Sequence, residues 1–312
     1  MPRYIWWLLG AALVVAPLLS GNRYFLYIAT MVTILIPMAL SINLTLRLGQ
    51  LSLAQPAFMG IGAYTSALLV MNLGVPSGLA ILAGGLLATL AAVVVGPIFL
   101  RVKGVYFVLL TYSFAQIVNL NFQYWTTPFG GNNGLFGIPP ISYPGGDLIS
   151  KNTFYFLLGL ILTAISLYIM RRFEKSDSGM ICDALNEDEM LCLALGSNAL
   201  SWRIAAFACS ALMAGISGGV YAFFIGFISP DSFGFQLSVD LIVMNVVGGV
   251  SSTFGPVLGS VIIVPLLELL RDARQYQLLV YGLCLLFFML FCRKGLVSLV
   301  WRGLRRNSFG NA

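Results

Sequence analysis

The sequence of 312 residues contains no histidine and few charged residues of any kind. Charged side chains make up 9% of the chain, whereas they make up about 25% of an average soluble domain. Histidine is the commonest general base and metal ligand, so its absence argues against most hydrolytic and metal-dependent chemistry. The chain also lacks a GxxxxGK[ST] phosphate-binding loop. We therefore expect no catalytic site, no metal and no bound cofactor.

Hydrophobic residues are correspondingly abundant in the sequence. They account for 59% of the chain and form apolar runs along most of its length. The hydrocarbon core of a bilayer takes about 20 apolar residues per crossing helix, so the chain has room for about 8–10 crossings. We predict an all-α integral membrane protein, a polytopic helical bundle that forms one transmembrane domain over residues 1–312.

The apolar runs give a ten-span topology. Eight of the expected spans are 1–21, 24–46, two spans within 48–100 separated by a turn at 72–78, 105–124, 153–170, 204–228 and 277–292. The first could be a signal peptide, but no small-x-small cleavage site stands out, so it is interpreted as a helix. The last two segments, 237–250 and 256–270, are only about 15 residues long, near the lower limit for a crossing. They form either two short helices or one re-entrant hairpin, and both choices preserve the topology.

The distribution of lysine and arginine indicates in which direction the chain is inserted in the membrane. The ten-span topology places 13 of the 17 basic residues on one side of the membrane. Those on the other side are Arg23, Lys151, Arg271 and Arg274. Because cytoplasmic loops carry the excess of basic residues, both termini are predicted to be cytoplasmic, including the basic tail 293–312.

Two connecting segments stand out from the apolar runs. Residues 125–152 are rich in glycine and proline, which specify turns and allow no regular helix; the topology places this loop on the side of the membrane opposite the cytoplasm. Residues 171–203 form the one long polar interruption of the chain, with Glu187, Asp188 and Glu189 near its middle. We interpret 171–203 as a cytoplasmic docking loop for another protein. The alternative is a solvated connection with no partner.

The apolar runs contain neutral polar and small residues rather than charges. Gln50, Ser52 and Gln55 lie beside Pro56 and several glycines, a composition that can break a helix where it borders a water-filled path. The GxxxG pairs at 215–219 and 255–259 are interpreted as close helix packing. Asp240 and Glu268 lie near predicted span ends and are interpreted as interfacial charges. With no titratable group at mid-membrane, an ion-coupled carrier is the less favoured alternative.

Four stretches together resemble a known family. They are LGQLSLAQPAFMGIGAYTSALL (48–69), GGNNGLFGIPP (130–140), ALNEDEMLCLALGSN (184–198) and VVGGVSSTFGPVLGS (246–260). In order and spacing they are similar to the permease of the branched-chain amino acid ABC importers, over residues 48–295. The resemblance implies a multi-pass protein of the bacterial inner membrane, with 125–152 as a periplasmic loop. It also implies two cytoplasmic ATP-binding subunits that bind the ATP, a second homologous permease and a periplasmic substrate-binding protein.

The resemblance also assigns roles to residues. The ATPase-coupling element would comprise Asp183, Glu187, Asp188, Glu189 and Gly196. Asn186 stands where relatives usually have arginine, and Cys192 stands where alanine is common, so the contact with the ATPase is expected to be less basic than usual. The translocation path is predicted to include Gln50, Ser52, Gln55, Tyr64, Gln116 and Asn245.

The partners in this prediction are protein subunits and membrane lipid, with no nucleic acid. A neutral path suits a zwitterionic amino acid, and it suits urea or a short amide equally well. Alongside the importer, an ion-coupled secondary transporter and a membrane scaffold without transport activity remain as alternatives.

Overall fold

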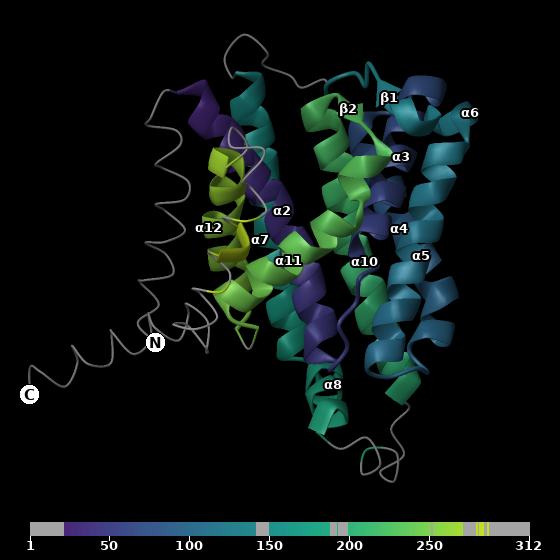
Figure 1. Ribbon diagram of the computed structural model, residues 1–312, viewed down its shortest axis with the longest axis vertical. Helices are drawn as coiled ribbons and strands as arrows, with labels where there is room; N and C mark the ends of the chain where they lie inside the picture. Colours follow the sequence, from purple (N-terminus) through teal and green to yellow (C-terminus); the bar gives the residue numbers. More distant parts are fainter. Residues whose placement is uncertain are drawn as a thin grey trace, which may run out of the picture.

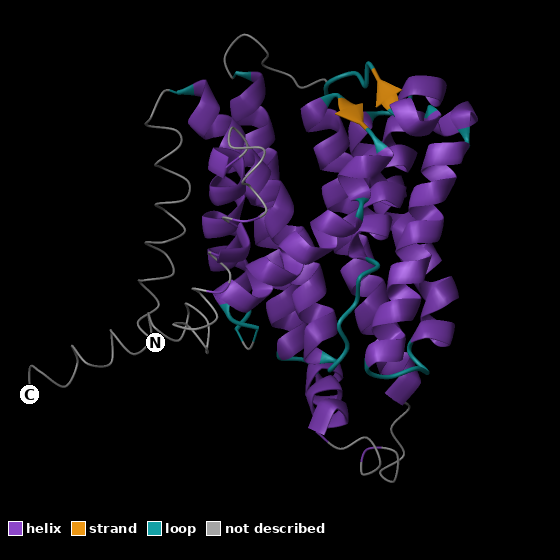
Figure 2. Cartoon of the chain, viewed as in Figure 1, coloured by secondary structure: helices purple, strands orange, loops and turns teal. Residues whose placement is uncertain are grey.

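The computed structural model describes residues 22–141, 150–187, 192, 199–250, 252–270, 279, 281–283 and 286. Six of its helices are long and apolar enough to cross a membrane, and helix dominates the described chain (Figure 2). They are α2 (Arg23–Arg47), α3 (Gln55–Leu73), α4 (Ser77–Phe99), α5 (Val105–Tyr124), α7 (Lys151–Glu174) and α10 (Ala199–Ile225). The predicted all-α polytopic fold is confirmed. The spans expected at 1–21 and 277–292 and the tail 293–312 lie wholly or largely outside the described residues.

Shorter elements complete the described chain. The segment after α5 contains α6 (Thr126–Phe129), the 3₁₀ turn η1 (Gly131–Asn133) and β1 (Leu135–Phe136). Further along are α8 (Asp177–Glu187), β2 (Phe227–Ile228), η2 (Pro230–Phe233), α11 (Phe235–Gly248) and α12 (Gly255–Leu269). Strands β1 and β2 pair antiparallel and join the segment after α5 to the end of α10. The sequence predicted the turns of this segment but not the strand pair, and its expectation of no regular helix was wrong for the four residues of α6.

The helices form two groups that stand side by side in Figure 1. Helices α3, α4 and α10 pack against one another, and α5 packs on α3. Helices α2, α7 and α12 form the second group, with α2 in contact with both of its companions and with α10. Helix α11 runs obliquely between the groups and packs mainly against α12 and α2.

Small residues bring the helices of the first group into close contact. A Cβ atom on Gly62 of α3 would overlap the Gly215 carbonyl of α10, and one on Gly218 would overlap the Met59 carbonyl of α3. The Ser66 hydroxyl donates to the Gly62 carbonyl at 2.7 Å and is 3.1 Å from the Ala80 carbonyl of α4. The packing interpretation of the GxxxG pair at 215–219 is therefore confirmed.

Helix α2 is more buried than α7, and a neighbouring helix satisfies the break in its hydrogen-bond ladder. Pro37 lies inside α2 and has no N–H to donate to the Thr33 carbonyl one turn earlier. The Thr163 hydroxyl of α7 donates to that carbonyl at 2.8 Å instead. A break in the helical ladder is thus satisfied from within the protein, as a membrane interior requires.

The outer faces of the bundle are apolar. Helix α4 exposes leucine, valine and isoleucine along much of its length, and α5 and α7 also expose large apolar side chains. In water such continuous apolar surface would be unfavourable, whereas in a bilayer it contacts acyl chains or another membrane subunit.

The two ends of the bundle differ in charge. Seven basic residues lie at the end where α2, α4 and α7 finish and α10 begins, which we call the basic end (Figure 1). They are Arg47, Arg101, Lys103, Arg171, Arg172, Lys175 and Arg203. The other end, which we call the strand end, carries β1, β2, Arg23 and Lys151. Among the described residues, the basic residues therefore segregate as the sequence topology requires.

Candidate functional site

The chain is not helical between α2 and α3. Residues 50–54 form neither helix nor strand and lead from the basic end into the bundle, and α3 begins at Gln55 with Pro56 in its first turn. Gln50, Ser52 and Gln55 are all buried, and the Gln55 amide is 3.3 Å from the Ser210 hydroxyl of α10. The side-chain oxygens of Gln50 and Gln55 have no hydrogen-bond partner among the described residues. The third span, which was expected within the run that begins at residue 48, starts only at Gln55, after the residues whose composition can break a helix.

The other three predicted path residues lie in different surroundings. Tyr64 is buried and its ring stacks on Phe122, with the ring centres 4.1 Å apart. Gln116 is half-buried on α5. Asn245 is buried on α11 and donates to the Ala39 and Leu241 carbonyls, each at 2.9 Å. The six residues do not converge on one cavity, and their role in a path remains a prediction.

Helices α11 and α12 form a short antiparallel pair, and the turn that joins them lies near the basic end. Gly248 and Gly255 meet backbone to backbone, and Gly259 of α12 lies against the Met244 carbonyl of α11. A pair of short helices joined by a tight turn is common to both arrangements left open by the sequence, two short crossings and one re-entrant hairpin. The GxxxG pair at 255–259 also serves close packing, as predicted.

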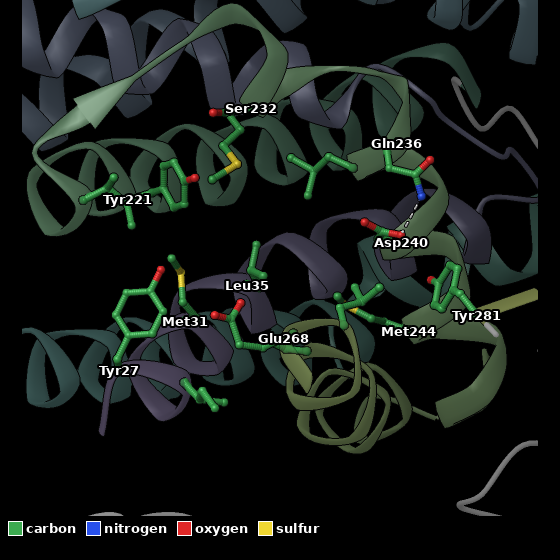
Figure 3. A pocket seen from close by; sticks show the side chains of 16 residues that line it. Tyr27, Met31, Leu35, Tyr221, Ser232, Gln236, Asp240, Met244, Glu268 and Tyr281 are labelled. Carbon is green, nitrogen blue, oxygen red and sulfur yellow. Dashed lines mark hydrogen bonds between the residues drawn. The ribbon is translucent and has the colours of Figure 1, made fainter. Parts of the chain in front are cut away.

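A cavity of about 730 Å³ lies between α2, α10, α11 and α12, in the half of the bundle nearer the strand end. Its walls are largely apolar, with Met31 and Leu35 of α2 and Met244 of α11 among them (Figure 3). Its polar lining consists of Tyr27, Tyr221, Ser232, Gln236, Asp240, Glu268 and Tyr281. None of the six path residues predicted from the sequence lines it.

Asp240 and Glu268 both point into this cavity from different helices (Figure 3). Gln236 donates to an Asp240 carboxylate oxygen at 3.1 Å, one turn earlier on α11. The sequence interpretation treated these two carboxylates as separate interfacial charges. The sequence could not show that they share a cavity, because the two residues are 28 positions apart and the relative orientation of their helices was not predicted. No signal in the sequence pointed to Tyr27, Tyr221 or Tyr281.

A buried polar network joins α11 to the basic end of α2 and α7. Asn43 of α2 donates to the Asn245 side chain at 3.1 Å and accepts from Arg47 at 3.1 Å. Arg47 forms a salt bridge with Glu174, the last residue of α7, and Thr253 in the α11–α12 turn donates to the same carboxylate. The network links three segments that lie far apart in the sequence. Only Asn245 of its members was singled out from the sequence.

Replacing Glu174 by glutamine should destabilise the protein by about 1–3 kcal/mol, because Arg47 would lose its counter-charge in a largely buried position. The measurement is the thermal unfolding midpoint of the purified protein in detergent. Asp177→Asn is the matched control, since it removes the same charge three residues later from an exposed side chain. Equal unfolding midpoints for the two variants would show that the network does not stabilise the basic end of the bundle.

The predicted ATPase-coupling residues fall at the basic end, where the structure describes only part of the segment. Residues up to 174 continue α7, and 177–187 form α8, which packs on α7, α10 and α2. Asp183 and Glu187 thus belong to a helix, whereas the sequence interpretation treated 171–203 simply as a loop. Asp188, Glu189 and Gly196 lie outside the described residues. Cys192 is buried and packs with Leu185 and Ile181.

The architecture is that of a polytopic membrane protein: a helical bundle with a cavity between its helices, a non-helical segment before α3 and a helical extension at its basic end. Residues 24–291 match the family described as "Branched-chain amino acid transport system / permease component". The chain therefore belongs to that family, as the resemblance indicated.

Curated relatives agree with this assignment. The chain is 32% identical over 305 residues to the high-affinity branched-chain amino acid transport system permease protein LivM of Salmonella typhimurium, covering 90% of this chain and 72% of that protein. It is also 32% identical over 295 residues to LivM of Escherichia coli, covering 87% of this chain and 69% of that protein. No solved structure matches the chain.

Proposed function

We propose that this chain is the membrane permease of an ATP-driven importer that carries branched-chain or related small amino acids across the bacterial inner membrane. The observation that carries the proposal is the family match over residues 24–291. The distribution of basic residues supports an orientation with the basic end in the cytoplasm and the strand end facing the periplasm.

The proposed assembly contains subunits that supply what this chain lacks. Two cytoplasmic subunits bind and hydrolyse ATP, because this sequence has no phosphate-binding loop. A periplasmic binding protein delivers the amino acid to the strand end, and a second homologous permease completes the membrane part. In this assembly the present chain is a transport subunit rather than an enzyme, and it binds no cofactor of its own.

The contacts of α8 suggest how ATP-driven movement enters the permease. Helix α8 follows directly after Glu174 and packs against α2, α7 and α10. A displacement of α8 by the ATPases would act on the Arg47–Glu174 pair, and through Asn43 it would act on Asn245 of α11. Helix α11 also carries Asp240 into the cavity. A rigid-body shift of this kind is a known way of switching a membrane protein between two states of access.

The buried neutral polar groups of the chain are also compatible with a second class of transported substrate. Gln50 and Gln55 have side-chain oxygens without partners, and such amide groups could serve urea or a short amide as well as a zwitterion. This alternative keeps the same assembly and changes only the substrate.

Reconstitution of the complete importer in liposomes tests the proposal. ATP in the cytoplasmic compartment, together with the binding protein outside, should drive uptake of radiolabelled leucine, and ionophores that abolish ion gradients should leave the uptake unchanged. The same liposomes should show no uptake without ATP or without the ATPase subunits.

Two results would contradict the proposal. Uptake of leucine by this chain alone, driven by an ion gradient, would identify a secondary transporter. ATP-dependent uptake of urea without uptake of any branched-chain amino acid would identify the alternative substrate.

A further inference from the structure

Helix α5 is the least buried of the six described spanning helices, and it stands at the outer edge of its group (Figure 1). Its exposed side chains include Leu109 and Ile117, as expected of a helix that contacts lipid. Between them lie Tyr112, Ser113 and Gln116, of which Ser113 is exposed and the other two are half-buried. Because residues three and four positions apart share one helix face, these three side chains form one surface patch, which we call the α5 polar patch.

Two members of the α5 polar patch have hydrogen-bonding groups without partners. The Ser113 hydroxyl donates to the Leu109 carbonyl at 2.9 Å, but the Tyr112 hydroxyl and the Gln116 amide make no hydrogen bond within the part of the chain that the structure describes. At a rise of about 1.5 Å per residue, Gln116 lies about 16 Å from the start of α5 and about 12 Å from its end. Acyl chains offer no hydrogen bond at this depth, so an amide that faced them would be costly.

The neighbouring outer helices place their polar residues differently. On α7, Thr163 and Ser166 are buried, and the exposed positions include leucine and isoleucine. On α4, the half-buried Thr89 donates to the Gly85 carbonyl at 2.8 Å, and the large exposed side chains are leucine, valine and isoleucine. This contrast indicates that α4 and α7 contact lipid, whereas the middle of α5 contacts another polar surface.

The connectivity of the chain favours an occupant from another subunit. Residues 1–21 are joined to α2, and the segment after residue 270 follows α12. Both helices belong to the second group, and Tyr281 of the later segment lines the cavity beside them. Helix α5 belongs to the first group, on the opposite side of the bundle (Figure 1).

We propose that the homologous second permease docks on the α5 polar patch. This inference rests on the proposed importer function, in which that permease is the only other subunit that reaches the middle of the membrane. Side chains such as glutamine, serine and asparagine form hydrogen bonds between helices within a bilayer. The Gln116 amide, which both donates and accepts, makes such bonds with polar groups of the partner.

The docking surface extends from α5 onto the start of α11. Phe235, the first residue of α11, is 48% exposed. It lies edge-on to the Tyr112 ring, with the ring centres 5.3 Å apart. The second permease therefore covers aromatic surface beside the polar groups, and the outer faces of α4 and α7 remain in lipid.

Site-specific photo-crosslinking in the assembled importer locates this surface. Benzoylphenylalanine replaces Ile117 beside the patch, or Leu90 of α4 or Ile161 of α7 as matched controls, since the three side chains are exposed to 58%, 58% and 57%. Irradiation should link position 117 to a tagged second permease and the two control positions to lipid. Links from position 117 to lipid alone, or to a second copy of this chain, would overturn the proposal. Links to the second permease from position 90 or 161 instead of 117 would also overturn it.

Replacing Gln116 by leucine tests the hydrogen bonds of the patch. Gln116→Leu should weaken association with the second permease by about three- to thirtyfold, because hydrogen bonds between the two subunits are lost. Thr89→Val is the control, since it removes a polar group from the middle of α4, where the hydroxyl is satisfied within its own helix. The measurement is the dissociation constant of the two labelled permeases in detergent. An unchanged constant for Gln116→Leu would contradict the proposal.

Uptake measurements separate this inference from the proposed function. If the unaltered importer takes up leucine with ATP and position 117 links only to lipid, the docking surface is wrong and the importer function stands. If the importer takes up no branched-chain amino acid, the proposed function fails, and links from position 117 still decide where the co-purified second permease docks. If no second permease co-purifies with the chain, both proposals fail.

Discussion

Gly62→Val is expected to prevent the bundle from folding stably, with a loss of more than about 3 kcal/mol in the free energy of unfolding. Even a single Cβ atom at this position would overlap the Gly215 carbonyl of α10, and the obstruction is backbone rather than a flexible side chain. Helices α3 and α10 would have to separate, which would also disturb the Ser66 bridge to α4. The measurement is the yield and thermal unfolding midpoint of protein that elutes as a single species in detergent.

Gly78→Ala is the control for this prediction. Gly78 lies in the first turn of α4, and a Cβ atom there would meet nothing within 4 Å. Since alanine is the better helix former, this variant should be as stable as the original or more stable by about 0.5–1 kcal/mol. If Gly62→Val unfolds at the same temperature as Gly78→Ala, the close approach of α3 and α10 is not required for the fold.

Charge reversal of Glu187, Asp188 and Glu189 to lysine should reduce leucine uptake to background. The expected cause is loss of the ATPase subunits, because a docking surface with reversed charge repels the partner that its original charge attracted. The unfolding midpoint of the isolated permease should remain unchanged, since α8 lies at the end of the bundle and this acidic run is polar. Co-purification of the ATPase subunits with tagged permease measures the association directly.

Asp231→Lys supplies the comparison at the strand end. It reverses the charge of an exposed residue in η2, directly after β2, and β2 and α8 lie at opposite ends of the bundle (Figure 1), so the ATPase subunits should still co-purify with it. If the triple reversal retains both the subunits and uptake, residues 187–189 do not form the docking surface. If the triple reversal abolishes uptake and lowers the unfolding midpoint as well, the acidic run stabilises the fold rather than the interface with the ATPase.

The long helices could be predicted closely because their apolar runs are continuous. The span predicted at 105–124 coincides with α5, and the other long spans agree within a few residues at most ends. One informative difference is α7, predicted to end at 170 and observed to continue to Glu174. Its last turn is charged, so hydrophobicity gives no sign of it, although arginine and glutamate are good helix formers.

The candidate site could be predicted only in part because it depends on contacts between distant segments. The break before Gln55 is local and was visible in the composition of residues 49–56. The cavity forms only where α2, α10, α11 and α12 meet. The polar network forms only because Arg47 contacts Glu174, which lies 127 residues later in the chain. Hydrophobic periodicity identifies which segments are helices but not which faces of distant helices meet.

The links between the two helix groups have a mechanical consequence. The described connections between the groups are residues 48–54, before α3, and residues 226–234, after α10. Neither is an α-helix, and Gly49 and Gly226 adopt left-handed backbone conformations that would strain other residues. We expect each to act as a hinge that lets one group tilt against the other without breaking a turn of any spanning helix. The resistance to such tilting then resides in side-chain contacts, chiefly where α10 meets α2 and where α11 bridges the groups.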